Sequence, residues 1–143
     1  MYDAKNLAYI LTCLEAIEKL YLYTEDIASG EDLLQRKDQL YYNACILLLS
    51  VIGEETKKVS KEIKDDYPNV PWQEILRMRN RISHDYRGLD ADIAYVTITQ
   101  RLIPLKTALI EIFYNIDYPP DKRHKVLASP YYSHLHYLKN DHE

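Results

Sequence analysis

The chain has 143 residues, of which 47% are apolar and 28% charged, so we expect one globular domain with a single core. Its formal net charge of −4 excludes a molecule that attracts nucleic acid over its whole surface, and any such binding must come from a local patch. The apolar runs are shorter than the ~18 residues of a membrane span, and no signal peptide begins the chain. We therefore expect a cytoplasmic protein that does not contact a membrane.

Apolar residues at spacings of three and four predict two long helices in the first half of the chain. The first spans roughly residues 4–28, with Asp3 as its cap, and stops at Ser29-Gly30. The second spans about residues 33–59, with a possible short continuation through residues 60–64. Gly53 lies inside it at a cost of ~1 kcal/mol relative to alanine, so we expect it to permit close contact with another helix.

A loop bounded by two prolines, residues 65–71, separates these helices from the second half. Pro71 suits the first turn of a third helix, which is predicted to end near residues 83–86. A fourth helix begins at Asp90 or Asp92 and runs past Ile112, and Pro104 should bend it. The Tyr118-Pro119-Pro120 sequence then breaks the helix.

Four helices with short connections predict an all-α fold, an antiparallel four-helix bundle over residues 1–116. Three glycines and six prolines in the whole chain agree with a helical rather than a turn-rich β protein. Residues 117–143 form a C-terminal extension rich in histidine and tyrosine. We expect this tail to pack outside the bundle or onto a partner.

The stretch R-N-R-I-S-H-D-Y, residues 79–86, carries the strongest chemical signal. Arg79 supplies a fixed cation that can stabilise the charged oxygens of a phosphorane, and His84 supplies an imidazole that moves protons near neutral pH. Cleavage of an RNA phosphodiester needs these two groups. Arg79 and His84 are therefore the predicted catalytic residues of an endoribonuclease.

A helical wheel places Arg79 among apolar residues, where a cation is costly unless an anion or acceptor meets it. Glu54 or Glu55 could supply that anion across the bundle, or both could be solvated surface carboxylates. His84 falls on roughly the opposite side of a regular helix. The two groups can meet if the helix unwinds before His84, if the long Arg79 side chain reaches to the helix end, or if a second subunit supplies one of them.

Further arginines, Arg77, Arg81 and Arg87, surround the motif. From residue 77 to 87 there are four arginines and one aspartate, a local charge of +3 in an acidic chain. This asymmetry indicates an RNA-binding site, although a solvated cationic helix face is the alternative. Asn80 either supports His84 or the phosphate, or simply forms a hydrogen bond with His84 one turn away.

Metal and cofactor chemistry finds little support in the sequence. His134 and His136 are two potential ligands on one tail segment, which is too few for a good metal site. There is no phosphate-cradling glycine loop, so no metal and no cofactor are expected.

An ordered set of motifs resembles the HEPN superfamily, and in particular its HepT toxin branch in type VII toxin–antitoxin systems. The resemblance covers roughly residues 4–115. Its motifs are R-x4-H followed by x-Y at residues 79–86, I-G-E at 52–54, Ser60, P-W at 71–72, M-R-N at 78–80, Asp90 and L-I-P-L at 102–105.

This resemblance implies a homodimer of four-helix bundles in which two copies of the motif face each other. It also implies a toxin that is a metal-independent endoribonuclease. Its antitoxin would be an MntA-like minimal nucleotidyltransferase that transfers AMP onto the motif tyrosine, Tyr86 by position. The alternative function is a non-catalytic helical module that binds such a transferase.

Overall fold

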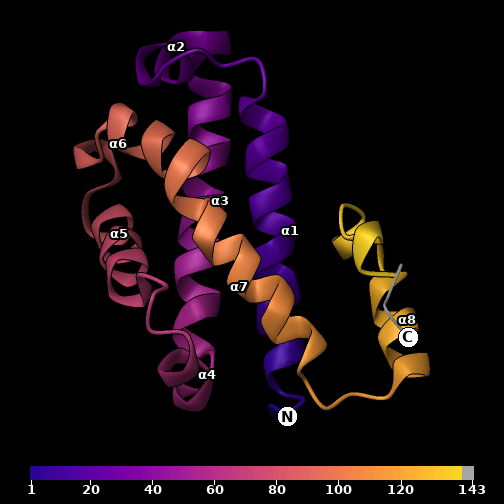
Figure 1. Cartoon of the computed structure of the whole chain (residues 1–143). Helices are drawn as coiled ribbons and strands as arrows, with labels where there is room; N and C mark the ends of the chain where they lie inside the picture. The colour runs from indigo at the N-terminus through magenta and orange to yellow at the C-terminus, as the bar shows by residue number, and fades with distance from the viewer. Residues whose placement is uncertain (140–143) are drawn as a thin grey trace.

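The protein is a bundle of four long helical segments that alternate in direction, as the sequence predicts. The computed structural model describes residues 1–139, except for the side chain of Tyr86. The long segments are α1 (Asn6–Thr24), α3 (Leu40–Lys58), α5 (Trp72–Asp85) and a broken helix made of α6 (Ala91–Val96), the π-helical turn η3 (Thr97–Arg101) and α7 (Leu102–Tyr114). Figure 1 shows α1 and α3 side by side, α7 crossing them, and α5 on the far side of α3 from α1. The all-α prediction is confirmed, because the described residues contain only one isolated β-bridge, between Tyr2 and Ile116.

The core lies where α1, α3 and α7 meet. Apolar residues three and four positions apart place one stripe of each helix inside, which is the pattern that gives a bundle its hydrophobic driving force. Cys13 and Cys45 belong to this core as free thiols, and burial raises the pKa of Cys45 to about 12. The fully buried large side chains in these helices include Ile10, Leu11, Leu14, Ile17, Leu20, Ile52, Leu105, Leu109, Ile112 and Phe113.

The predicted start of the second helix, near residue 33, is wrong, because the helical segment is interrupted before α3. A short helix α2 (Gly30–Gln35) ends in the 3₁₀ segment η1 (Arg36–Gln39), and α3 begins only at Leu40. Lys37, Asp38 and Gln39 have φ values of 48°, 55° and 69°, so three successive residues adopt the left-handed conformation. This conformation is unfavourable for residues with a Cβ atom, and it reverses the chain direction at the top of the bundle.

Shorter differences appear at two other places. The predicted continuation beyond Val59 exists, but as a separate helix α4 (Lys61–Asp66). Pro104 lies in the first turn of α7, and the π-helical turn η3 directly precedes that helix. Proline lacks an amide donor and its ring displaces the carbonyl one turn earlier, so the preceding turn widens.

Gly53 permits the close approach of α3 and α5, as its position in the helix predicts. A Cβ atom built on Gly53 would overlap Cβ of Arg79, and it would lie 2.8 Å from Cγ of Arg79 and 3.4 Å from the carbonyl oxygen of Ile75. A side chain at residue 53 would therefore push the two helices apart. The contact fixes α5 against the bundle and turns Arg79 toward α3.

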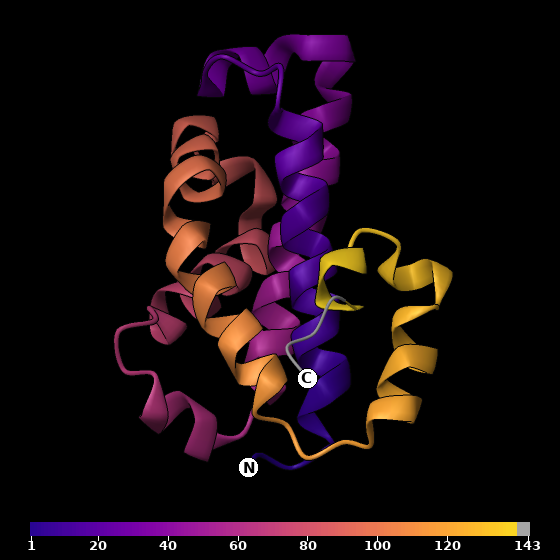
Figure 2. The ribbon, with the colours of Figure 1, turned by 45° about the vertical axis from the view of Figure 1, so that its right-hand side comes forward.

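The C-terminal extension packs against α1, on the side of the bundle away from α5 (Figure 2). It contains α8 (Pro120–Leu127) and the 3₁₀ segments η4 (Pro130–Tyr132) and η5 (His136–Lys139). The buried carboxylate of Glu15 accepts hydrogen bonds from the backbone N–H of His134 at 2.8 Å and pairs with its ring Nδ1 at 2.5 Å. Tyr137 donates to Glu18 at 2.9 Å, so the tail is held to α1 by two acidic side chains. Residues 140–143 of the predicted tail lie outside the described residues.

Between residues 1 and 139, no helix combines the length and apolar character that would be needed to cross a lipid bilayer.

We predict that Gly53→Ala destabilises the protein, although the same substitution in an open helix would stabilise it by about 1 kcal/mol. The added methyl group must displace Arg79, and such overpacking costs about 1–3 kcal/mol. Urea unfolding followed by circular dichroism measures the change. Asn43→Ala is the control, since Asn43 is exposed on the same helix and should be neutral or slightly stabilising. A Gly53→Ala protein more stable than the wild type would contradict the close contact.

Candidate active site

Arg79 lies at the contact of α3 and α5, where Glu54 neutralises it. The Arg79 guanidinium forms an ion pair with the Glu54 carboxylate across the two helices, and its Nη1 donates to Oδ1 of Asn80 at 2.8 Å. The side chains of Arg79 and Glu54 are 25% and 40% exposed, so the pair is open to solvent and to ligands. Of the two carboxylates that the sequence offered, Glu54 therefore meets the arginine, whereas Glu55 pairs with Lys58 at 3.3 Å.

His84 lies on a different face of the same helix. Helix α5 stays regular through Asp85, so the five residues from Arg79 to His84 turn the chain by about 140°. His84 is exposed, and within the described part of the chain it forms no hydrogen bond to Arg79 or Asn80. Unwinding before His84 is thus excluded, and the end of the Arg79 side chain is directed to Glu54 and Asn80 instead. A single chain does not bring the two predicted catalytic groups together.

The turn that follows α5 is closed by Asp85 and Gly88. Oδ1 of Asp85 accepts a hydrogen bond from the backbone N–H of Gly88 at 3.2 Å, and a Cβ atom on Gly88 would lie 2.6 Å from Oδ2 of Asp85. This contact ends the helix in the 3₁₀ segment η2 (Tyr86–Gly88). Tyr86, the predicted modification site, begins η2, and its side chain lies outside the described part of the structure.

Arg77 and Arg81 are exposed on the face of α5 that is turned away from Arg79. They line a groove with Arg101 of η3, whereas Arg87 is exposed on η2 and does not line it. Sequence reasoning missed Arg101. The sequence carried no signal for it, because Arg101 meets α5 only through the packing of the broken helix.

No group of three or more histidine, cysteine, aspartate or glutamate side chains within residues 1–139 is arranged to hold a metal ion. The chemistry available at α5 in the described chain is therefore that of guanidinium groups, one imidazole, and the carboxylate and amide that contact Arg79.

The chain is similar to known proteins over most of its length. The model of the family described as ribonuclease HepT-like matches residues 13–112, which include α3, α5 and both motif residues. A protein named probable ribonuclease HepT from Thermococcus cleftensis is 33% identical over 98 residues, which cover 68% of this chain and 86% of that protein. No solved structure matches the chain significantly.

Two relatives from Methanocaldococcus jannaschii extend the comparison. One, named a putative RNase, is 28% identical over 110 residues, covering 77% of this chain and 88% of its own length. The other, named a gamma-glutamylcyclotransferase and putative RNase, is 27% identical over 120 residues, and the chain spans 53% of that longer protein. The names of the matched family and of these relatives agree with the predicted enzyme class. On the strength of a match that includes α3, α5 and the whole R-x4-H motif, the chain belongs to the ribonuclease HepT-like family.

Proposed function

We propose that the protein is the toxin of a toxin–antitoxin pair and cleaves RNA without a metal ion, with Arg79 and His84 as its catalytic residues. The observation that carries this proposal is the half-buried Arg79, held at the helix contact by Glu54 and Asn80 and still open to solvent. A guanidinium in this state can exchange its carboxylate partner for a phosphodiester, because both anions accept the same paired hydrogen bonds. The family match supports the ribonuclease class.

The mechanism uses the RNA itself as the source of the nucleophile. The 2′-hydroxyl attacks the adjacent phosphorus and loses its proton to an imidazole, and the 5′-oxygen leaves with a proton from a second acid. His84 acts as the base or as the acid, and its copy in a second subunit takes the other role. Arg79 binds the non-bridging oxygens as their charge grows. The products are a 2′,3′-cyclic phosphate and a 5′-hydroxyl.

A homodimer would overcome the divergence of Arg79 and His84 within one chain. Leu40, Leu47 and Glu54 are seven residues apart on α3 and therefore lie along one stripe of that helix. Leu40 and Leu47 are 59% and 64% exposed, and the stripe leads to the Glu54–Arg79 pair. Exposed leucines on the helix stripe that leads to Glu54 favour a second copy of the chain as the partner.

We also propose that Tyr86 is the target of an MntA-like nucleotidyltransferase antitoxin. Tyr86 follows α5 directly, two residues after His84, so an attached AMP would bring its phosphate to the basic end of this helix. There it would compete with RNA phosphate for the arginines of α5. The proposal explains how one modification could silence the enzyme.

An alternative is a non-catalytic module that binds the transferase. The Glu54–Arg79 ion pair favours this alternative, because it gives the arginine a structural role that needs no RNA. In that case neither Arg79 nor His84 would contact RNA.

We predict that purified protein cleaves RNA in the presence of a chelator, and that Arg79→Ala and His84→Ala each lower the rate by at least about 100-fold. Gel analysis of labelled RNA, with identification of the cyclic phosphate, measures this. His124→Ala is the matched control, because His124 is exposed on α8 and lies outside the motif. Strict dependence on a divalent metal, or full activity of His84→Ala, would overturn the mechanism, whereas absence of any cleavage by the wild type would favour the binding module.

We predict that Leu47→Lys converts a dimer into a monomer and abolishes cleavage, because a charge would replace an apolar contact at the interface. Light scattering coupled to size-exclusion chromatography measures the mass. Ile103→Lys serves as control, since Ile103 is 54% exposed on α7, outside the proposed interface. The proposed interface is incorrect if Leu47→Lys keeps the same mass and activity as the wild type.

We predict that incubation with ATP and the cognate transferase raises the intact mass by whole AMP units, and that Tyr86→Phe removes this gain. Loss of RNA binding should accompany the modification. Tyr131→Phe is the control, because Tyr131 is 80% exposed and could accept AMP if the transferase selected tyrosines by exposure alone. Continued labelling of Tyr86→Phe would place the acceptor elsewhere.

A further inference from the structure

A groove runs along the face of α5 that is turned away from Arg79, and we name it the basic groove. It has a volume of about 290 Å³ and is bordered by Arg77, Arg81 and Arg101, with Glu74 at one side and Leu89 and Ile93 among its apolar lining residues. Two arginines come from α5 and the third comes from η3, 20 residues later in the chain. Only the tertiary packing of α5 against the broken helix assembles this set.

The three arginines of the basic groove are exposed and lack a side-chain partner within the described part of the chain. Among the described residues, none of them forms an ion pair or hydrogen bond with another side chain. Three guanidinium groups and one carboxylate leave the groove with a charge of +2 in a chain whose net charge is −4. Unpaired cations gathered in an acidic protein are the electrostatic footprint of a phosphate-rich ligand.

The basic groove shares its face of α5 with His84. Arg77 precedes His84 by seven residues and Arg81 precedes it by three, so on the helix they lie within about 20° and 60° of the histidine. Arg79, in contrast, is about 140° away and faces α3. A strand that lies in the groove would therefore run toward His84 along the helix, over a rise of about 10 Å from Arg77.

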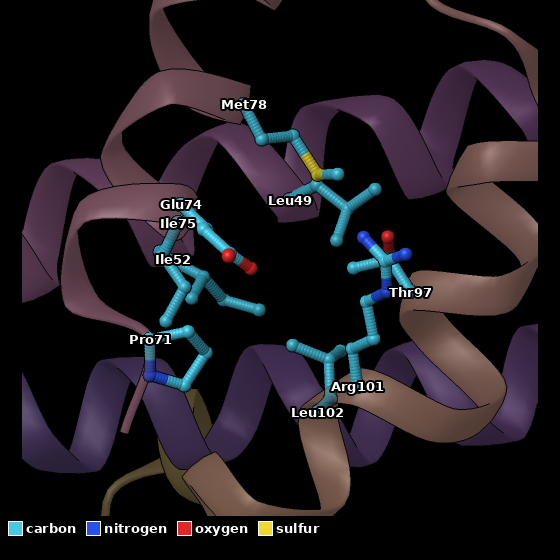
Figure 3. A pocket seen from close by; sticks show the side chains of 9 residues that line it. All are labelled: Leu49, Ile52, Pro71, Glu74, Ile75, Met78, Thr97, Arg101 and Leu102. Carbon is cyan, nitrogen blue, oxygen red and sulfur yellow. The ribbon is translucent and has the colours of Figure 1, made fainter. Parts of the chain in front are cut away.

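At Glu74, Met78 and Arg101 the groove adjoins a smaller cavity of about 50 Å³ between α3, α5 and η3 (Figure 3). Glu74 reaches into this cavity from α5, and Arg101 reaches into it from the opposite wall. Leu49, Ile52, Ile75, Met78 and Leu102 supply most of its surface. A ligand in the groove thus meets apolar surface as well as cations, which suits unstacked bases beside a phosphate backbone.

We propose that the basic groove binds a single-stranded segment of the RNA substrate beside the scissile linkage, with Arg77, Arg81 and Arg101 on its phosphates. The bases lie over Met78 and the exposed Ile93. A double helix would keep its bases out of reach, because they are stacked inside. This inference rests on the proposed ribonuclease function and adds a substrate-binding site distinct from Arg79. It adds Arg101 to the predicted RNA-binding arginines, whereas Arg87 lies outside the groove and its RNA binding stays a prediction.

The test measures the binding of a fluorescein-labelled single-stranded 2′-O-methyl RNA, which lacks the attacking hydroxyl, by anisotropy at several salt concentrations. Arg101→Ala and Arg81→Ala should each weaken binding by on the order of 5- to 10-fold and lower the slope of log K against log salt by about 0.7. Glu74→Gln should strengthen binding by about 2- to 5-fold, because it removes the carboxylate from the groove. Lys122→Ala is the control and should change nothing, since Lys122 is an exposed cation of α8. Helix α8 lies on the opposite side of the bundle from α5 (Figure 1).

Two comparisons separate this inference from the proposed function. If cleavage of unmodified RNA requires His84 but RNA affinity is unchanged in Arg101→Ala and Arg81→Ala, the proposed RNA site in the groove is wrong and the proposed nuclease function stands. Binding that depends on Arg101 without any cleavage would support the groove and remove the catalytic proposal. Equal affinity of the protein for duplex and single-stranded RNA would also overturn the inference. Polyglutamate serves as a probe for an acidic protein partner. If Arg101→Ala lost polyglutamate binding but kept RNA binding, the groove would instead be assigned to such a partner.

Discussion

The contact between α3 and α5 at Gly53 determines how this protein can use its motif. The missing side chain at residue 53 lets the backbone of α3 approach the Cβ and Cγ atoms of Arg79. The next residue of α3, Glu54, then lies within reach of the guanidinium. The consecutive residues Gly53 and Glu54 therefore determine the distance between α3 and α5 and the orientation of Arg79. Because Arg79 is held toward α3 while α5 stays regular, His84 necessarily points elsewhere.

The strength of the Glu54–Arg79 pair suits a temporary partner. Ion pairs between partly exposed side chains contribute up to about 1 kcal/mol, since water solvates both groups almost as well when they are apart. An RNA phosphate that takes the place of Glu54 loses little of this energy and gains the charge-assisted hydrogen bonds of the guanidinium. Glu54 would then keep the arginine oriented in the free protein and release it to the substrate. A fully buried pair could not act in this way, because separating it would cost several kcal/mol.

The sequence predicted what depends on local pattern and missed what depends on tertiary packing. The bounds of α5, the role of Gly53 and the helix end before Pro119 follow from helical periodicity and from the properties of glycine and proline. The break at residues 36–39 could not be foreseen, because Lys37, Asp38 and Gln39 adopt left-handed backbone angles without a glycine or asparagine to signal them. Likewise, the choice of Glu54 over Glu55 as the partner of Arg79 depends on the rotation of α3 against α5, which periodicity alone does not fix.

The π-helical turn links this packing to the charge of the surface. Pro104 cannot donate a hydrogen bond to the carbonyl one turn earlier. The helix widens into a π-helical turn at residues 97–101, and this turn carries Arg101. Thr97 and Arg101 both line the space between η3 and α5, so the widened turn faces the helix that bears the motif. The cations of α5 are thereby divided into two sets with different surroundings. Arg79 is neutralised by Glu54 and faces the bundle, whereas Arg77 and Arg81 join Arg101 on the open side beside His84. In this way an acidic protein gathers positive charge beside His84, and under the proposed function that charge would guide a phosphate backbone to the imidazole.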